Sequence, residues 1–515
     1  MLRDKNNQLS IYSILYNKIP ENHILKLIEK AVDFSFVTSL LEKSYNKYYG
    51  RPAKDPEMMI KLLVLQYFYN LSDEKVIEEA SLNIAHLWFL GVNPNDELPH
   101  PSLLAKFRVH RLQDVTLDEI IVEIVKQCVE KGIIKDTSIS IDATHTEANT
   151  FKAVPERVMK RLAKKIFKTY EEESGELPEN IDQNIPDYKK IENHKEAKQT
   201  MKDYLEKEIE KVQKIVIQEK NPKTIKVLQN AREILKDPKF IEQRGARSLV
   251  DQEARVGHKS KTEHFFGYKT EFTMTTEDRI ITAVVIESGE YVDGTNFNKL
   301  IELTEKTGLT VEEVYGDKAY FRKSILDKIQ EIKAKPYIPI SESVYKIDEG
   351  KFSYNKDSDE WFCSEGNNSI RKTYMKRKDG RQSYKYYFKR EICKACPNRN
   401  ECITGKVQAK ILNIGINTPE FYEYSQEQKL PEFLEKYKKR ACHEWKNGEM
   451  KNHHGLNRAK GYGKRSMSTQ AKLTAIAVNL KRIANILSSK FPSFFDFILN
   501  MLRFKPTFHQ KVIIL

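Results

Sequence analysis

The sequence of 515 residues has few cysteines, six in all, and no apolar run long enough to cross a membrane. Scarce cysteines are typical of proteins in a reducing compartment, where disulfides rarely persist. The amino-terminal stretch MLRDKNNQLSIYSILYNKIP has no apolar run after its early basic residue, so no secretory signal is expected. The most apolar late segment, residues 491–504, is shorter than the ~20 residues that span a bilayer. We therefore expect a cytoplasmic protein without a membrane partner, and interpret this late segment as a packing helix or tail.

The chain also lacks internal repeats, but it is rich in charge of both signs. It has 87 lysines and arginines against 73 aspartates and glutamates, for a net charge of +14. An apolar content of 40% is enough to bury a core in each of two to four domains. A basic excess favours a polyanionic partner, most often nucleic acid, although charge alone does not establish binding.

Residues 1–133 are predicted to form a helical domain. Asp55 followed by a proline predicts the start of one helix, Ser72 can cap a second, and Gly91 ends the run. A further helix, rich in Lys, Arg and His, is expected to begin at Ser102. This pattern fits a DNA-binding module and an ordinary helical domain equally well, because no base-reading pattern is visible.

Residues 134–340 are predicted to form an α/β domain. Ile139 and Ile141 alternate with polar residues as in a β-strand, which places Asp142 near the end of that strand. Two further strands, at 267–275 and 280–288, are expected to form a hairpin. Strands are also expected at 311–320, with Asp317 at the strand end, and at 336–340. Helices are expected before each of them, at 297–308 and 321–333. The order predicts a mixed sheet with helices on its faces.

Two insertions and a helical carboxy-terminal part complete the predicted organisation. Residues 151–245 indicate a charged helical insertion in the α/β domain, and residues 341–425 indicate a second insertion that holds most of the cysteines. Residues 426–515 return to helix and include an amphipathic helix at 470–487.

The stretch YKKRACHEWKNGEMK, residues 437–451, carries four reactive side chains at helical spacing. Tyr437, Arg440, Glu444 and Lys451 would lie within roughly 60° of one another around a single α-helix. Mixed charges on a lone helix usually mark a solvated face.

Three acidic residues follow the order of a metal-dependent active site: Asp142 and Asp317 at two strand ends, and Glu444 on a later helix. Carboxylate oxygens suit Mg²⁺ or Mn²⁺, and two such ions can activate an attacking hydroxyl and stabilise the leaving oxygen in phosphoryl transfer.

The surrounding motifs resemble those of the DDE transposases of bacterial insertion sequences, in the superfamily named for insertion sequence four. Residues 437–451 match Y-x2-R-x3-E-x6-K at every position, SIDAT at 140–144 resembles the first-aspartate strand, and YGDKAY at 315–320 resembles the second-aspartate segment. The amino-terminal helical domain and residues 453–483 are also similar to parts of such transposases.

The resemblance implies a ribonuclease-H-like core, two Mg²⁺ or Mn²⁺ ions, and cutting and joining of DNA at terminal inverted repeats. By motif match, Asp142, Asp317 and Glu444 would be the metal ligands. The residues expected at DNA are Tyr437, Arg440, Lys451, Lys318, Tyr320 and Arg458. Double-stranded transposon ends and target DNA would be the partners, with a homodimer in the synaptic complex and a nucleoid-associated location.

Further residues near these motifs have two interpretations. His145 and Glu147 are turn residues or supports for the metal ligands, and Asp251, Arg255 and His258 are candidates to line a DNA channel. Four cysteines form either a structural zinc site or a set of reduced packing cysteines: Cys363, Cys393, Cys396 and Cys402. The C-x2-C pair is typical of zinc sites, whereas the C-x5-C spacing is not. Cys128 and Cys442 are expected to pack singly.

The leading hypothesis is therefore a DNA transposase. The alternatives are a metal-dependent nuclease that cuts DNA without strand transfer, and a non-catalytic DNA-binding protein on the same fold.

Overall fold

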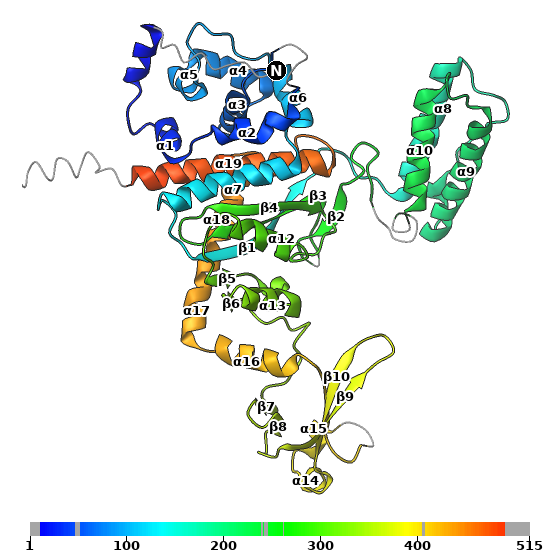
Figure 1. The fold of residues 1–515 in the computed structure, drawn as a ribbon. Coiled ribbons are helices and arrows are strands. Elements are labelled where there is room, and N and C mark those ends of the chain that lie inside the picture. Colours follow the sequence, from blue (N-terminus) through cyan, green and yellow to red (C-terminus); the bar gives the residue numbers. More distant parts are fainter. Residues whose placement is uncertain are drawn as a thin grey trace, which may run out of the picture.

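The computed structural model describes residues 11–46, 52–237, 240, 246–260, 262–403 and 407–489 (Figure 1). The predicted packing helix or tail at 491–504 lies outside the described residues. None of the helices that the structure describes is both long enough and apolar enough to cross a membrane.

The amino-terminal part is helical, as predicted. Its elements are η1 (Ile11–Lys18), α1 (Ile24–Ala31), α2 (Phe36–Leu41), η2 (Glu42–Ser44), α3 (Pro56–Phe68), α4 (Asp73–Leu82), α5 (Ile84–Leu90), α6 (Ser102–His110) and α7 (Asp114–Glu130). The side chains of Asp55 and Ser72 accept hydrogen bonds from backbone N–H groups in the first turns of α3 and α4. Gly91 ends α5 in the left-handed region, at φ 68°. The predicted helix start at Ser102 is also confirmed.

A mixed sheet with flanking helices follows, which confirms the predicted α/β class. Its elements are β1 (Ser138–Glu147), β2 (Arg255–His258), β3 (His264–Thr275), β4 (Ile281–Ser288), α12 (Phe297–Glu305), β5 (Glu313–Tyr315), η4 (Lys318–Tyr320), α13 (Lys323–Glu331) and β6 (Lys335–Tyr337). The strand order is β2-β3-β1-β5-β6, with β4 also paired to β3. Strand β3 is antiparallel to β1, β2 and β4, whereas β1, β5 and β6 are parallel.

Strand β1 is longer than predicted. Ile139 and Ile141 are fully buried, as the alternation predicts, but the strand continues to Glu147 because β3 pairs with it along that whole length. Asp142 therefore lies in the middle of β1, and the interpretation of His145 and Glu147 as turn residues was wrong. The parallel pairing of β1 with β5 covers only residues 138–140, so Asp142 lies just beyond the point where these strands separate.

The carboxy-terminal part returns to the sheet and contains α16 (Thr418–Gln428), α17 (Pro431–Tyr437), η5 (Lys438–Ala441), α18 (Cys442–Asn452) and α19 (Gly463–Ser488). The prediction of one continuous helix over 437–451 was wrong. Tyr437 ends α17, Arg440 lies in the 3₁₀ turn η5, and Glu444 and Lys451 lie in α18. Because a 3₁₀ turn has 3.0 residues per turn, the four side chains do not follow the stripe of a regular α-helix.

Helix α19 is a central element rather than the amphipathic helix predicted at 470–487. It packs against α1 and α3 on one side and against β4 on the other, with α7 alongside (Figure 1). The buried amide of Asn479 bonds the backbone of Ile281 in β4 through both of its polar groups, at 2.8 and 2.7 Å. Lys472, 1% exposed, lies 2.7 Å from both Asp114 and Asp118 of α7. Helix α19 thus joins the amino-terminal helices to the sheet.

The first insertion is a helical unit with its own core. It contains α8 (Pro155–Ser174), η3 (Tyr188–Lys190), α9 (His194–Ile215) and α10 (Pro222–Lys236), and it stands to one side of the sheet (Figure 1). Ala153 and Arg247 exchange two backbone hydrogen bonds of 2.9 and 3.0 Å at the base of this unit. The chain therefore leaves and re-enters the α/β layer at one neck.

The second insertion is mainly β-structure. It contains β7 (Phe352–Asn355), β8 (Glu360–Cys363), β9 (Ser369–Lys376), β10 (Gln382–Phe388), α14 (Arg390–Ala395), α15 (Arg399–Cys402) and β11 (Ile411–Gly415). Its small core is built around the fully buried Trp361, with Phe352 and Tyr386 among its buried neighbours.

Candidate active site

Asp142 and Asp317 lie on neighbouring parallel strands. Asp142 is in β1, and Asp317 follows the end of β5, where its side chain accepts a hydrogen bond from the N–H of Ala319 at 2.8 Å. Burial raises the pKa of Asp142 to about 6; Arg440 opposes this rise, whereas the charges of Asp317 and Asp293 add to it. The two aspartates are thus close enough to repel each other, and a bound cation would relieve that repulsion.

Arg440 lies at the centre of the acidic residues. Its Nη2 is 3.4 Å from Oδ2 of Asp142. Burial disfavours the charged guanidinium, but surrounding groups outweigh burial and raise the pKa of Arg440; these are Asp142, Tyr437, Asp317 and Glu444. All three predicted metal ligands therefore act electrostatically on one arginine. Within the described ranges, however, no three Asp, Glu, His or Cys side chains form a ready-made metal cluster.

Helix α18 is held on the sheet by the residues just before Glu444. Cys442 and His443 are buried, and the His443 ring lies 4.7 Å from the ring of Phe272. Phe272 is the register partner of Asp142, so this contact fixes α18 beside the first aspartate. Glu444 follows directly and is exposed. This role of His443 could not be predicted, because a lone histidine in a polar stretch does not indicate burial.

Lys451 lies at the far end of α18, beside His145 of β1. Its Nζ is 3.4 Å from Nδ1 of His145. Burial and the like charge of Lys259 lower the pKa of Lys451 to about 8, against the opposing effect of Glu147. Burial also lowers the pKa of His145 to about 4, with Lys451, Lys259 and Lys269 contributing. Cationic groups thus crowd this end of the site.

The other residues predicted to contact DNA differ in their positions. Tyr437 is half-buried and stacks on Phe433, with ring centroids 6.0 Å apart. Lys318 is exposed on η4, next to Asp317. Tyr320 is only 1% exposed, so the expected contact with DNA does not fit the structure; its ring packs in the core because η4 turns it inward.

Glu271 is a buried carboxyl group that the sequence analysis missed. It lies on β3, 1% exposed, and accepts hydrogen bonds from Tyr320 at 2.8 Å, Tyr291 at 2.6 Å and the N–H of Gly294 at 2.6 Å. Burial raises the pKa of Glu271, and these three donors oppose that rise. It thus anchors the loop after β4 to the segment that carries Asp317. Nothing in the pattern EFTMT distinguishes this glutamate from a surface residue.

The loop after α18 makes internal contacts. Arg458 donates to Oδ1 of Asn149 at 3.1 Å, and the backbone beside it pairs with Glu147 at the end of β1. Among the channel candidates, Asp251 is buried and accepts a hydrogen bond from Tyr268, so it is a structural residue. Arg255 and His258 line a groove next to the carboxylates.

Comparison with known protein families matches two segments of the chain. Residues 13–110 match a model described as a transposase domain (DUF772), and residues 362–484 match a model described as a transposase DDE domain. The chain thus carries two transposase domains, the second of the DDE type. The second match contains Tyr437, Arg440, Glu444 and Lys451, whereas Asp142 and Asp317 lie between the two matched segments.

Other comparisons add little to this assignment. No curated protein matches the transposase. One solved structure, a piggyBac transposase synaptic complex with hairpin DNA, aligns over 95% of this chain and 86% of its own, at 9% identity and a TM-score of 0.24. So low a score carries no argument about fold or mechanism.

The cysteine cluster lies in the second insertion of the transposase. Cys363, Cys393, Cys396 and Cys402 line one small cavity as free thiols. Burial raises the pKa of the Cys402 thiol; Lys410 opposes this, and the three other thiols add to it. The four sulfurs are therefore neighbours, without forming a metal cluster in the described structure. Cys128 and Cys442 are buried apart from them, as predicted for single packing cysteines.

Proposed function

We propose that this transposase cuts and joins the ends of its own element through a two-metal site at Asp142, Asp317 and Glu444, in a ribonuclease-H-like core. The observation that carries the proposal is that Arg440 lies 3.4 Å from Asp142 and that the charges of Asp142, Asp317 and Glu444 all raise the pKa of this one arginine. The antiparallel run β4-β3-β1 followed by the parallel strands β5 and β6 supports the proposed core.

The donor chemistry fits Mg²⁺ or Mn²⁺. Both cations prefer carboxylate oxygens and retain positions for water and phosphate oxygens. Asp142 and Asp317 repel each other, and within the described part of the chain the ion-pair partner of Asp142 is Arg440, at 3.4 Å. The bound ions would supply activation of the attacking hydroxyl and stabilisation of the leaving oxygen.

The surrounding residues would position the scissile phosphate. Arg440 can form two parallel hydrogen bonds with a phosphate, and its pairing with Asp142 holds it at the carboxylates until DNA arrives. Lys451 supplies a second cation at the other end of α18, and its crowding by Lys259 favours an incoming anion. The stacked ring of Tyr437 and the exposed Lys318 would contact DNA on either side.

The rest of the chain would recognise DNA. Residues 1–133 are proposed as the DNA-binding domain, 134–340 as the catalytic core with its 151–245 insertion, 341–425 as a second insertion, and 426–515 as the helical completion of the core. The net charge of +14 supports double-stranded DNA as partner, both as terminal inverted repeats and as target. Arg458 is a further candidate contact. Bringing two ends together implies a homodimer and a nucleoid-associated protein.

Purified protein incubated with Mg²⁺ and DNA carrying the element's ends tests the chemistry. Asp142→Asn and Glu444→Gln are expected to abolish cleavage. Glu435→Gln is the matched control, because Glu435 is exposed and pairs with Lys438 at 2.6 Å, away from Asp142. Cleavage that survives Asp142→Asn or Glu444→Gln would refute the proposed site.

The same assay separates the alternatives. Nicked DNA without joined molecules would identify a nuclease that lacks strand transfer. DNA binding without any cleavage in Mg²⁺ or Mn²⁺ would identify a non-catalytic binding protein.

We propose in addition that Cys363, Cys393, Cys396 and Cys402 bind structural Zn²⁺. Their shared cavity supports this, since thiolates are preferred zinc ligands. Elemental analysis of protein purified under reducing conditions tests the proposal. Near-stoichiometric zinc that is lost in Cys393→Ser is expected; zinc-free protein would identify a cluster of reduced packing cysteines.

A further inference from the structure

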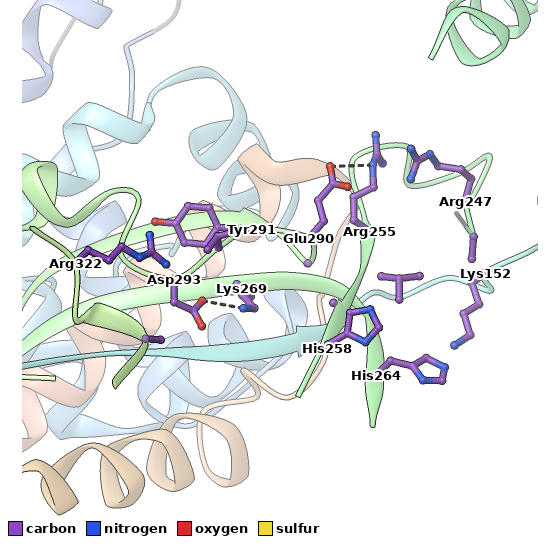
Figure 2. Close-up of a pocket in the computed structure, with 16 residues that line it drawn as sticks. Lys152, Arg247, Arg255, His258, His264, Lys269, Glu290, Tyr291, Asp293 and Arg322 are labelled. Carbon is purple, nitrogen blue, oxygen red and sulfur yellow. Dashed lines mark hydrogen bonds and ion pairs between the residues drawn. The ribbon is translucent and has the colours of Figure 1, made fainter. Parts of the chain in front are cut away.

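A groove of about 840 Å³ opens between the sheet and the neck of the first insertion (Figure 2). Residues of β2, β3 and the segment after β4 form one wall, and Lys152 and Arg247 of the neck form the other. Its inner end contains Asp293, whose charge acts on Asp142. The groove therefore leads away from the first catalytic carboxylate.

The lining of the groove is cationic. Its permanently charged side chains are Lys152, Arg247, Arg255, Lys269 and Arg322, against the carboxylates Glu290 and Asp293. Both carboxylates already pair with cations of the same wall: Glu290 lies 3.8 Å from Arg255, and Asp293 lies 2.8 Å from Lys269. The surplus positive charge makes the groove complementary to a polyanion.

Two arginines form the most specific feature of this lining. Arg247 is 7% exposed, and its guanidinium lies beside that of the half-buried Arg255 (Figure 2). Burial lowers the pKa of Arg255, and the like charge of Arg247 lowers it further. Holding two guanidinium groups together costs free energy. Asp237, 2.8 Å from Arg247, and Glu290, 3.8 Å from Arg255, offset part of that cost. An anion placed between the two guanidinium groups would offset more of it through charge-assisted hydrogen bonds. A phosphate group has the geometry for such bonds.

The groove also offers aromatic rings. The ring of Tyr291 is fixed, because its hydroxyl donates to Glu271 at 2.6 Å and accepts from the N–H of Asn296 at 2.7 Å. The rings of His258 and His264 are exposed on β2 and β3. A cationic groove with aromatic rings is the combination by which proteins hold single-stranded nucleic acid.

Its dimensions favour a single strand over a duplex. The floor is formed by closely packed backbone, where a Cβ on Gly257 would lie 2.2 Å from the carbonyl oxygen of Gly289. The floor therefore carries no side chains at these two positions. A volume of about 840 Å³ lies within the ~300–1,000 Å³ range of sites that enclose small ligands, so a few nucleotides fit and a double helix does not.

We infer that this groove binds a short single-stranded segment of DNA adjoining the scissile phosphate, with Arg247 and Arg255 clasping one phosphate and the aromatic rings stacking on bases. The inference rests on the proposed function, because it takes DNA as the substrate. It adds that the protein holds the DNA end with its two strands separated.

Fluorescence anisotropy of the full-length protein with labelled oligothymidine, in EDTA to prevent cleavage, tests the inference. Arg255→Gln is expected to weaken single-strand binding at least about tenfold. The slope of the logarithm of the binding constant against the logarithm of the salt concentration should become shallower by about 0.7 per lost phosphate contact. Binding of a duplex of equal length should change less than about twofold. Lys152→Gln, an exposed neck residue, should weaken single-strand binding in the same direction without affecting the fold.

The matched control is the double variant Lys164→Gln with Lys165→Gln, which removes exposed charges from α8, outside the groove. It should leave single-strand binding unchanged. Equal loss of duplex and single-strand binding in the groove variants, or no loss in either, would overturn the inference. Asp142→Asn should retain single-strand binding, so failure of the proposed chemistry and failure of the groove are seen in separate measurements.

Discussion

The buried ion pair between α19 and α7 gives a stability prediction that can be worked out from the structure. Lys472 is 1% exposed and lies 2.7 Å from both Asp118, itself 6% exposed, and the more accessible Asp114. Lys472→Met removes the cation and leaves Asp118 buried without its partner. Breaking a buried pair in this way costs about 3–5 kcal/mol.

The cost should depend on pH. Burial already raises the pKa of Asp118, and Lys472 opposes that rise. Without the lysine the folded-state pKa rises further above the unfolded value, so the variant loses stability as pH increases through the folded pKa. Each additional pKa unit corresponds to about 1.4 kcal/mol. The Lys472→Met defect is therefore expected to be larger at pH 8 than at pH 5.

Hydrogen-exchange mass spectrometry measures the loss of stability in Lys472→Met locally, as the free energy of opening of peptides from α7 and α19. The double variant Lys472→Met with Asp118→Leu removes both charges and should recover most of the loss, because a packed apolar pair replaces a buried ion pair at little cost. Strictly additive losses in the double variant, or a Lys472→Met effect below about 1 kcal/mol, would refute the reasoning.

Three further predictions concern stability. Burial lowers the pKa of His454, whose Nδ1 donates to the carbonyl of Tyr67 at 2.8 Å. The contribution of neutral His454 to the free energy of unfolding is full above about pH 6.5 and falls as the pH drops toward the lower folded-state pKa. The urea midpoint should therefore fall more steeply with acid in the wild type than in His454→Gln. Asn479→Leu leaves two buried backbone groups of β4 without a hydrogen-bond partner and should cost about 1–3 kcal/mol for each. An unchanged urea midpoint would show that the contact between Asn479 and Ile281 does not stabilise the fold. Tyr291→Phe removes one donor to Glu271 and should cost about 1–3 kcal/mol, whereas thermal unfolding identical to the wild type would show that this hydrogen bond contributes nothing.

The local elements of the fold could be predicted because their causes lie within a few residues. The caps at Asp55 and Ser72 and the burial of Ile139 and Ile141 follow from short-range chemistry. The order of the elements predicted Asp142 and Asp317 at the ends of two strands of one sheet, whereas the parallel pairing of these two strands, β1 and β5, is seen only in the structure.

Features that depend on distant packing could not be predicted. The turn η5 carries Arg440, which contacts Asp142 almost three hundred residues earlier in the chain. Glu271 is buried because segments after β4 and β5 close over it, and Arg247 approaches Arg255 only because the neck of the insertion closes. None of these contacts leaves a periodic pattern in the sequence.

The paired hydrogen bonds between Ala153 and Arg247 have an evolutionary consequence. A unit attached through a single neck can be lengthened, exchanged or lost without shifting the register of any strand that carries an acidic residue. The same neck supplies Arg247 to the groove wall, so such an exchange would alter the charge of the proposed single-strand groove. The proposed carboxylate site on the sheet would stay unchanged.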